Sequence, residues 1–491
     1  MREINSPLFL LLISFLIELK PVLFWTYLWQ LKEYRLDRFR SSFGWQKILR
    51  FYLFNGGRQF HYPKWTLKSI LIIVSSLGSG LLIGLMLIQS RISLFWLEIL
   101  TVILVYFTAP ILVAVFVFIF RWPSILIKQF IYLLARKKIS EIKNILVIGI
   151  TGSYGKTSTK EILSQILSQK FTVISTPGNI NTEIGLSKFI LKNSKLSHKT
   201  KPDSSQPLIF IAEMGAYRVG EIKKICQMVR PQIGILTGLC PQHLSLFGSF
   251  EKIKQAKMEL IKSLPPNGLA VFNGDDENIR PIAQKYSRKK IIYSAAQVKE
   301  FNFPWPEYYR TNLSGAINIA KYLDIKPSEI QESINNLYPT NQIAQLKKGK
   351  NGTIIIDDSY NINPTGAIAN LNYLATFSNK RRIIVLPCLI ELGNKSADIH
   401  YQIGQKIAQV CQKAIVTNLE CAAAIKAGAE SINPKINRKV SNQKIIFTSN
   451  LKRVTKLLKD ELGSQTVILI EGRILKKIKE FLIPKISHNK S

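Results

Sequence analysis

The sequence is short of cysteine and of acidic residues, and both shortages narrow the classes of protein that it can encode. Its five cysteines include no Cys-x-x-Cys pair, so neither a disulfide scaffold nor a zinc ribbon is expected, and they fit a reducing compartment. Glycine and proline occur at ordinary frequency, with 27 and 21 residues, which excludes a collagen-like chain. Apolar residues make up 47%, so the chain can bury enough surface to offset the entropy of folding and is not disordered.

The scarcity of acidic residues leaves a large positive charge. Against 31 Asp and Glu stand 67 Lys and Arg, a formal net charge of +36 over 491 residues, which is a length typical of roughly three domains. Nucleic acid, an anionic membrane surface and phosphorylated substrates would each attract such a chain. An AT-biased codon pool, which favours Lys, Ile and Asn, also explains part of the charge. No nucleic-acid motif accompanies it, so no nucleic-acid partner is expected.

Two long uncharged runs stand near the N-terminus, at residues 69–89 and 99–120. Each has the length of a bilayer-spanning helix, about 20 residues, and Pro110 in the second run is tolerated in membrane helices. The alternative is a pair of buried core helices. Because two such runs so close together are difficult to bury in a soluble domain, the sequence predicts two transmembrane helices.

A third apolar segment, Pro7 to Trp29, is interrupted by Glu18, Lys20 and Pro21. Each charge at mid-membrane costs about 2.5–3.5 kcal/mol on insertion scales. The segment is either a third span, with Glu18 and Lys20 paired inside a bundle, or an interfacial helix with an aromatic belt. A span is favoured. No small-residue cleavage site follows, so a signal peptide is not expected.

Basic residues predict the orientation of these segments. Between Lys32 and Lys68 lie nine basic residues, whereas the link between the two clear spans offers only Arg91. A further basic cluster follows at 121–138. The positive-inside rule therefore places residues 30–68 and everything after Arg121 in the cytoplasm. The expected location is the cell (inner) membrane, multi-pass, with residues 124–135 as an amphipathic connector along its surface.

From Lys143 the pattern changes to short β-rich runs that alternate with helical ones. A buried strand at 145–150 is followed by a glycine-rich turn and an amphipathic helix at 160–169. Further strands are expected where the sequence reads LIFIAEM, IGILTGL, GLAVFN and KIIYSA. This alternation predicts an α/β fold with a mostly parallel sheet and crossover helices.

The turn TGSYGKT, from Thr151 to Thr157, is typical of a phosphate-binding loop. Its glycines let backbone N–H groups surround a phosphate, and the following helix N-terminus adds its dipole. Lys156 can reach the terminal phosphates and Thr157 can bind Mg²⁺. The longer pattern GxxxxGK[ST] would need Gly at position 150, where this chain has Ile, so the match is to the shorter TGxxGKT variant. The loop predicts a nucleotide and Mg²⁺, held by Gly152, Ser153, Gly155, Lys156, Thr157 and Ser158.

Seven further blocks follow this loop. They are TPGNINTEIG (176–185), EMGAYRVGEI (213–222), PQHLSLFGSFEKIKQAKMEL (241–260), FNGDDENI (272–279), DDSYNINP (357–364), IELG with a later His (390–393 and 400) and ILIEGR (468–473). With the loop, they resemble the Mur ligases, the ATP-dependent amide ligases that build peptidoglycan precursors. The resemblance extends from about residue 143 to 480 and is greatest to the MurF type, whose corresponding blocks include EMGANHPGEI, DDSYNANP and LVKGSR.

The resemblance implies roles for individual residues. Lys156, His243 and Lys257 would be catalytic, and Thr157, Glu213, His243 and Lys257 would bind metal, with Lys257 carrying a carbamate made with CO₂. The alternatives that the residues alone leave open are a solvated strand-end charge for Glu213, a structural loop histidine for His243 and a surface lysine on a basic helix for Lys257. The resemblance also implies nucleotide contacts from Asn312, Asp358, Tyr360 and Asn361, and an acceptor side formed by Asn179, Asn181, Glu183 and Asn363.

Several positions depart from the family pattern. Thr311 stands in place of His and Gly315 in place of a second Asn, which alters the expected adenine contacts. Pro387 and Cys388 replace a Gly-Asp pair, and the stretch before the C-terminal domain lacks the usual Arg. The family's N-terminal domain, which grips the UDP-sugar, has no recognisable counterpart, and the expected membrane spans stand in its place.

We therefore expect a membrane region at 1–140, a Mur ligase-like ATP-binding domain at 141–345 and a Rossmann-like C-terminal α/β domain at 346–491. The predicted function is ADP-forming ligation of D-Ala-D-Ala to a UDP-MurNAc-tripeptide-like acceptor through an acyl phosphate, with membrane lipid and cell-wall synthesis enzymes as further partners. Two alternatives remain: a ligase for a different, lipid-linked acceptor, and a catalytically inactive nucleotide-binding membrane scaffold.

Overall fold

The structure is a computed structural model that describes residues 7–36, 38–39, 62–89, 95–178, 180–194, 196, 206–301, 309–337, 345–359, 363–434, 436, 444–472 and 476–483. The chain divides into two compact units, Met1–Ile131 and Tyr132–Ser491, and each is described by itself.

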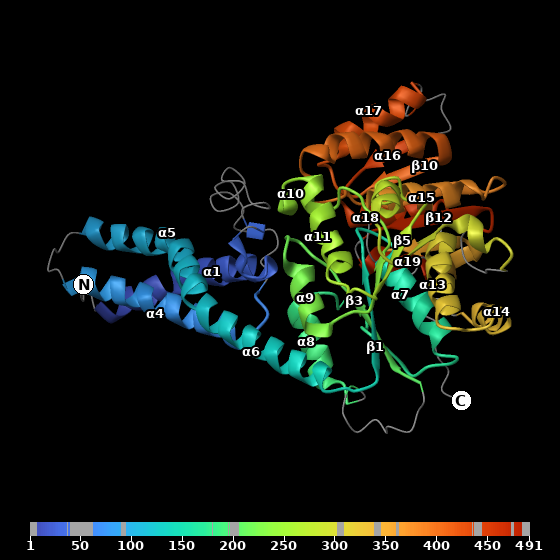
Figure 1. Ribbon diagram of the computed structural model, residues 1–491. Helices are drawn as coiled ribbons and strands as arrows, with labels where there is room; N and C mark the ends of the chain where they lie inside the picture. The colour runs from blue at the N-terminus through green and yellow to red at the C-terminus, as the bar shows by residue number, and fades with distance from the viewer. Residues whose placement is uncertain are drawn as a thin grey trace, which may run out of the picture. The chain divides into compact units, whose positions relative to one another are not determined.

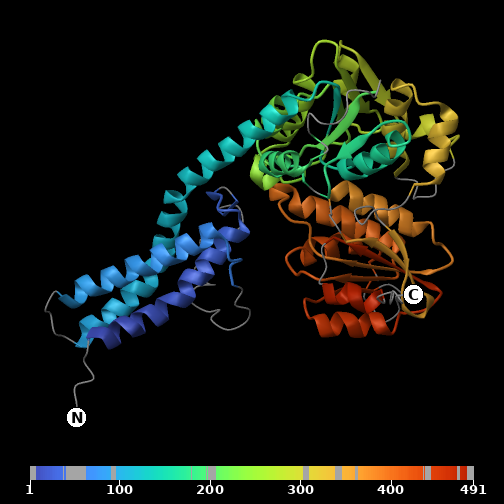
Figure 2. The same ribbon diagram turned by 90° about the horizontal axis from the view of Figure 1, so that it is seen from below.

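The first unit is a bundle of the apolar helices α1 (Pro7–Leu31), α4 (Leu67–Gln89) and α5 (Phe95–Ile119), which pack against one another (Figures 1 and 2). By length and composition, Leu67–Met86 and Tyr106–Ser140 could cross a membrane, and only 39% and 11% of their most apolar windows are buried.

The expected pair between Glu18 and Lys20 does not form. Glu18 is fully buried against Gly80 of α4, and its carboxylate oxygens have no hydrogen-bond partner in the part of the chain that is described. Residues two apart in a helix point in different directions, so the two side chains of α1 cannot meet.

Helix α6 (Arg121–Ser140) leads into the second unit. Its apolar residues Ile125, Leu126 and Phe130 are exposed, whereas Ala135 and Ile139 pack into the core below the first sheet. The end of the expected connector is thus a structural part of the sheet domain.

The first sheet has six parallel strands in the order β2-β3-β1-β4-β5-β6. They are β1 (Ile145–Thr151), β2 (Val173–Ser175), β3 (Leu208–Glu213), β4 (Ile233–Leu236), β5 (Leu269–Asn273) and β6 (Lys290–Tyr293). Alternate residues point to opposite faces, so Ile148 and Ile150 join one core while Val147 joins the other.

Helices cover both faces of this sheet. The first core contains residues of α7 (Lys156–Leu167), α13 (Arg310–Tyr322) and α14 (Pro327–Asn335), and the second contains residues of α8 (Glu183–Lys192), α9 (Glu221–Val229), α10 (Leu244–Phe247) and α11 (Phe250–Lys262). The short helix α12 (Arg280–Lys285) follows β5. Helix α7 begins at residue 156, earlier than the expected 160, because Gly155 adopts a left-handed conformation that starts the helix there.

The second sheet has the order β11-β10-β9-β12-β8-β7 and is parallel except for β7. Its strands are β7 (Gln345–Lys348), β8 (Ile354–Asp358), β9 (Arg381–Leu386), β10 (Lys413–Val416), β11 (Lys444–Phe447) and β12 (Thr466–Glu471). Its helices are α15 (Pro364–Ala375), α16 (Ser396–Val410), α17 (Ala422–Ile432), α18 (Leu451–Lys459) and α19 (Lys476–Leu482). The expected α/β class with two sheets is confirmed.

The cysteines do not all stay reduced as expected. Cys388 and Cys421 form a disulfide, while Cys226, Cys240 and Cys411 are buried and free. The bonded pair is separated by 33 residues, and parallel pairing of β9 with β10 brings the two segments together. Spacing along the chain could not reveal this proximity.

Candidate active site

The phosphate loop joins β1 to α7 at the carboxyl edge of the first sheet, where α/β proteins place their sites. Gly155 has φ +78°, and a Cβ there would lie 2.8 Å from Asn312 Oδ1. Both the backbone conformation and the close neighbour therefore require glycine at this position. The resulting turn presents the N-terminus of α7 to whatever occupies the loop.

A cavity of about 350 Å³ lies over this loop and is lined from both sheets. The first sheet and its helices supply Ser153, Tyr154, Gly155, Lys156, Thr157, Ser158, Asn273, Asp275, Tyr309, Thr311 and Asn312, and the second supplies Asp358, Asn363, Thr365, Gly366, Ala369 and Asn370. The size and the polar lining fit a nucleotide-sized ligand.

Lys156 folds back over the loop. Its ammonium donates to the carbonyl of Gly152 at 2.7 Å and to that of Ser153 at 3.3 Å. Burial lowers the pKa of Lys156, and Glu213 acts in the opposite direction. The lysine is thereby placed beside the glycines that would surround a phosphate.

Glu213, at the end of β3, collects several hydrogen bonds although it is only 1% exposed. Its carboxylate accepts from Thr157 Oγ1 at 3.0 Å, from Asn181 Nδ2 at 3.1 Å and from Lys160 Nζ at 3.2 Å. It is not a solvated strand-end charge. A carboxylate and a hydroxyl beside a phosphate loop are the hard oxygen donors that Mg²⁺ prefers, so these residues fit the ion.

Lys257 lies on α11 and is 4% exposed, so it is not a surface lysine. No hydrogen bond to its ammonium is found among the residues that the structure describes. Burial, and next the positive charge of Lys156, lower the pKa of Lys257 to about 7. A large fraction of this amine is therefore neutral near pH 7, which is the form that reacts with CO₂.

His243 begins the short helix α10 in a left-handed conformation, φ +57°. Its Nδ1 is hydrogen-bonded to the carboxylate of Glu391, and its ring packs edge-on against Tyr217 at 4.8 Å. Burial lowers the pKa of His243, while Glu391 acts in the opposite direction. Because Glu391 follows β9 of the second sheet, this contact joins the two sheet domains.

The structure shows the contacts of Thr311 and Gly315, the two residues that depart from the family pattern where adenine contacts are expected. Thr311 donates to Asp275 Oδ2 at 2.9 Å, and Asn312 Oδ1 accepts from Thr159 at 3.3 Å. A Cβ at Gly315 would lie 3.1 Å from the ring of buried Tyr293. The tyrosine ring thus fills space that a side chain at position 315 would need.

The second sheet contributes two buried carboxylates at the cavity wall. Asn370 Nδ2 donates to the carboxylate of Asp358 and, at 2.8 Å, to that of Glu471. Burial, with the nearby Asp357 charge, raises the pKa of Asp358 to about 6, and burial with Asp358 raises the pKa of Glu471 well above its ordinary value.

The chain matches two models of one protein family. Residues 150–333 match the model of the Mur ligase middle domain, and residues 344–474 match that of the "Mur ligase, glutamate ligase domain". The chain belongs to the Mur ligase family.

This Mur ligase has relatives named UDP-N-acetylmuramoyl-tripeptide–D-alanyl-D-alanine ligase. It is 28% identical to that of Synechocystis sp. over 305 residues, which are 58% of this chain and 65% of the relative. It is 27% identical to that of Escherichia coli over 288 residues, 53% of this chain and 61% of the relative. The match thus spans less than two thirds of either relative.

Solved MurF structures share the fold of this Mur ligase. MurF from Thermotoga maritima in complex with ADP has a TM-score of 0.58 and 25% identity, covering 72% of this chain and 83% of that one. MurF from Acinetobacter baumannii has a TM-score of 0.60 and 21% identity, covering 72% and 79%.

The structure places most of the predicted site residues of this Mur ligase in one of three groups, and Asn181 and Glu183 are further cases. At the cavity or its loop lie the residues from Gly152 to Ser158, with Asn312, Asp358 and Asn363. Outside the cavity lining lie Glu213, His243 and Lys257. Outside the described residues lie Asn179, Tyr360 and Asn361. Asn181 bonds to Glu213 rather than facing open space, and Glu183 begins α8 beside Lys224.

Sequence reasoning did not identify several residues that the fold brings to the site. They are Lys160, which is fully buried and bonds to Glu213, and the cavity residues Tyr154, Asn273, Asp275, Tyr309, Thr365 and Asn370. Only Lys160 had a usable signal, because it lies one helical turn after Lys156 on the same face of α7.

Proposed function

We propose that this Mur ligase forms an amide bond at the expense of ATP, joining D-Ala-D-Ala to a UDP-MurNAc-tripeptide-like acceptor. The observation that carries the proposal is the meeting of Lys156, Thr157 and Glu213 at a phosphate loop that faces a two-domain cavity. The acceptor carboxylate attacks the terminal phosphorus of ATP, and ADP leaves. The amine of D-Ala-D-Ala then attacks the acyl carbon, phosphate leaves, and the amine proton is released.

The chain's own residues have distinct parts in this scheme. Lys156 neutralises the terminal phosphate oxygens, and Asp358 and Asn312 hold the nucleotide from opposite walls. Thr157 and Glu213 would hold one Mg²⁺, and His243 with carbamylated Lys257 a second. The ions supply charge neutralisation for phosphoryl transfer. In the carbamate, the Lys257 nitrogen binds the carbon of CO₂ and loses a proton, so a cation becomes an oxygen donor.

We further propose that residues 1–140 anchor the enzyme in the inner membrane, that 141–345 form the ATP-binding domain and that 346–491 form the closing domain. Exposed apolar side chains on α4 and α5 support the anchor, and the basic residues at 32–68 and 121–138 support a cytoplasmic face for both sheet domains. Protease added to inverted membrane vesicles should digest the sheet domains, while protease outside intact cells should leave them whole.

The activity is tested with the full-length protein in detergent, supplied with ATP, UDP-MurNAc-tripeptide and D-Ala-D-Ala. ADP release that depends on D-Ala-D-Ala and is lost in Lys156→Met supports the proposal. No release above the Lys156→Met background, although nucleotide still binds, would leave the inactive scaffold as the better description.

A lipid-linked acceptor is a second candidate, because the exposed apolar faces of α4 and α5 would place the sheet domains at a lipid surface. The same assay with the tripeptide acceptor on an undecaprenyl-type lipid separates the two candidates. A higher kcat/KM for the lipid-linked acceptor favours the second, and activity on the soluble acceptor alone favours the first.

A further inference from the structure

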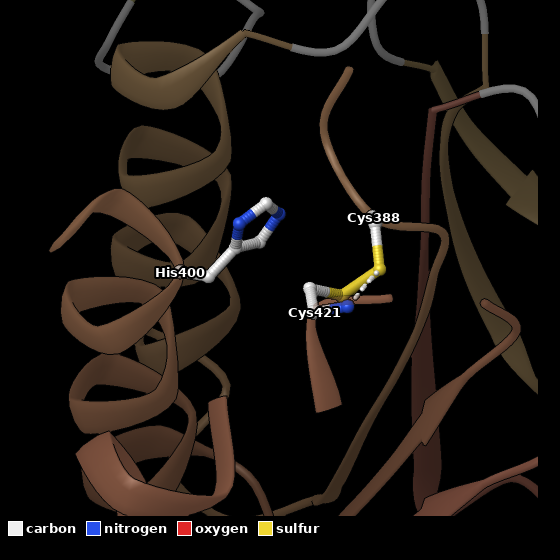
Figure 3. A group of neighbouring side chains, drawn as sticks. All are labelled: Cys388, His400 and Cys421. Carbon is white, nitrogen blue, oxygen red and sulfur yellow. Dashed lines mark hydrogen bonds between the residues drawn. A yellow bond between two sulfur atoms is a disulfide. The ribbon is translucent and has the colours of Figure 1, made fainter. Parts of the chain in front are cut away.

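A buried disulfide lies close to the contact between the two sheet domains. Cys388 follows β9, Cys421 immediately precedes α17, and the two are 6% and 5% exposed. The backbone N–H of Cys421 also donates to the sulfur of Cys388 at 3.0 Å (Figure 3). The neighbouring Ile390 is 70% exposed, so the bond lies directly beneath the surface.

His400 lies beside the two sulfurs but is occupied by backbone groups (Figure 3). Its Nδ1–H donates to the carbonyl of Ser396 at 2.7 Å, and its Nε2 accepts from the N–H of Leu389 at 3.0 Å. Neither ring nitrogen is free to bind a metal. The histidine instead holds the segment after Cys388 against α16, and the sulfurs have each other as partners.

The same segment reaches the other sheet domain three residues later. Glu391, in a left-handed conformation with φ +63°, hydrogen-bonds through its carboxylate to Nδ1 of His243, and its carbonyl accepts from the N–H of Ser245 at 3.2 Å. A carboxylate on one ring nitrogen of a histidine fixes the orientation of the other nitrogen. Glu391 is therefore a positioning residue for His243, and the disulfide fixes one end of the segment that carries it.

We infer that Cys388 and Cys421 form a reversible thiol–disulfide site that sets the position of Glu391 against His243. This inference rests on the proposed function for its activity readout and for the cytoplasmic location of the sheet domains. On the cytoplasmic side disulfides are rare and are usually redox-sensing. The protein disulfide forms when the two thiols react with a low-molecular-weight disulfide of the glutathione class. The S–S bond of this oxidant breaks, and the oxidant takes up two protons and two electrons and leaves as two thiols.

The consequence follows from the geometry. With the disulfide formed, Glu391 holds His243 and the two sheet domains are joined at Ser245. With the disulfide reduced, the segment loses its covalent link to the start of α17 and keeps the Leu389–His400 hydrogen bond and the core packing of Leu389 and Leu392, so Glu391 is held less firmly against His243. Loss of a carboxylate that orients a metal-binding histidine typically lowers activity about tenfold, and we expect a fall of that order on reduction.

The test uses full-length protein in detergent, equilibrated in buffers of graded reduced-to-oxidised glutathione ratio. Alkylation and mass spectrometry measure the fraction of disulfide, hydrogen exchange measures protection of the Ser245 amide, and ADP release measures activity. We expect disulfide fraction and Ser245 protection to fall together. Cys388→Ser and Cys421→Ser should match the reduced protein at every ratio, and Cys411→Ser, a buried free cysteine of the same domain, should match the unmodified chain.

The variant Glu391→Gln keeps both cysteines but removes the negative charge beside His243. It therefore separates formation of the disulfide from the effect of the disulfide on His243. Its disulfide should titrate normally while its activity stays low at every ratio. The inference is overturned if Cys388 and Cys421 stay in one oxidation state at every glutathione ratio, or if protection of the Ser245 amide is the same with and without the disulfide. It is also overturned if the reduced protein retains one zinc ion per chain, because the two thiols would then be metal ligands. If pairing and protection change together while no ligase activity is found, the proposed function fails and the thiol–disulfide site stands.

Discussion

The hydroxyl of Thr157 donates a hydrogen bond at 3.0 Å to the carboxylate of Glu213, which lies at the end of the neighbouring strand β3. The same carboxylate accepts from the buried ammonium of Lys160. Glu213 thus has two functions, since it completes a candidate Mg²⁺ site and balances a charge that has no access to water. These two functions give separable predictions.

Glu213→Gln should reduce both activity and stability. The substitution removes a metal-binding charge and leaves Lys160 with only Glu161 and the carbonyl of Gly178 among its described partners. Breaking a buried ion pair costs about 3–5 kcal/mol, and these remaining partners should reduce the loss below that range. ADP release and urea unfolding measure the two effects. The double variant Glu213→Gln/Lys160→Met should recover most of the stability and none of the activity. Recovery of activity would show that Glu213 acts only through Lys160.

Lys257→Met should remove a pH dependence as well as activity. Burial lowers the pKa of Lys257 to about 7 in the folded protein. Between that value and about 10.4, the unfolded state binds more protons than the folded state, so stability contributed by this group rises with pH. In CO₂-free buffer the unmodified chain should gain about 2 kcal/mol over Lys257→Met between pH 7 and 9. Urea unfolding measures this difference.

The exposed Lys252, on the same helix, supplies the control for that experiment. Lys252→Met should keep both the pH dependence and the activity. Parallel stability profiles for the unmodified chain and Lys257→Met would contradict the lowered pKa. Loss of activity on removal of bicarbonate, reversed by adding it back, would support the carbamate.

Glu471→Gln should stabilise the protein above pH 6. Burial, and next the Asp358 charge, raise the pKa of Glu471 well above its ordinary value, so the folded state binds more protons than the unfolded state above about pH 4, and stability falls as pH rises. Removing the Glu471 charge relieves the repulsion, and we expect a gain of about 1–2 kcal/mol at pH 8 and little change at pH 4. A pH series of thermal unfolding measures it.

Glu461→Gln is a matched control for which the opposite change in stability at pH 8 is expected. Burial alone would raise the pKa of Glu461, but hydrogen bonds from Arg381 and Lys413 outweigh it and lower the pKa. This carboxylate therefore stabilises the fold at neutral pH, and its contribution is lost as pH falls. Glu461→Gln should destabilise the protein at pH 8, and a gain in stability there would contradict the lowered pKa of Glu461.

Gly315→Asn, which restores the family residue, should destabilise this chain. The new Cβ would lie 3.1 Å from the Tyr293 ring, and overpacking a filled core costs about 1–3 kcal/mol. Tyr293→Phe should be tolerated, because the Tyr293 hydroxyl has no hydrogen-bond partner in the described ranges. Thermal unfolding of both variants and of Gly315→Asn/Tyr293→Ala measures the effect. Equal stability of Gly315→Asn and the unmodified chain would show that the ring moves aside.

Local signals predicted much of the fold. The run of strand and helix patterns after Lys143 predicted the parallel sheet, and the spacing of Gly152, Gly155, Lys156 and Thr157 predicted the loop, because these features depend on residues close together in the chain. The sequence pattern predicts the start of α7 at residue 160, four residues too late, because only the backbone conformation of Gly155 reveals where that helix begins.

The sequence alone determined the α/β class, the phosphate loop and the apolar N-terminal helices, because periodicity, glycine spacing and long uncharged runs are local properties. Only the tertiary structure decided which distant residues meet. Parallel pairing of β9 with β10 brings Cys388 to Cys421, and pairing of β8 with β12 brings Asp358 to Glu471. Contacts between segments far apart in the chain depend on strand order and register, which no single stretch of sequence encodes.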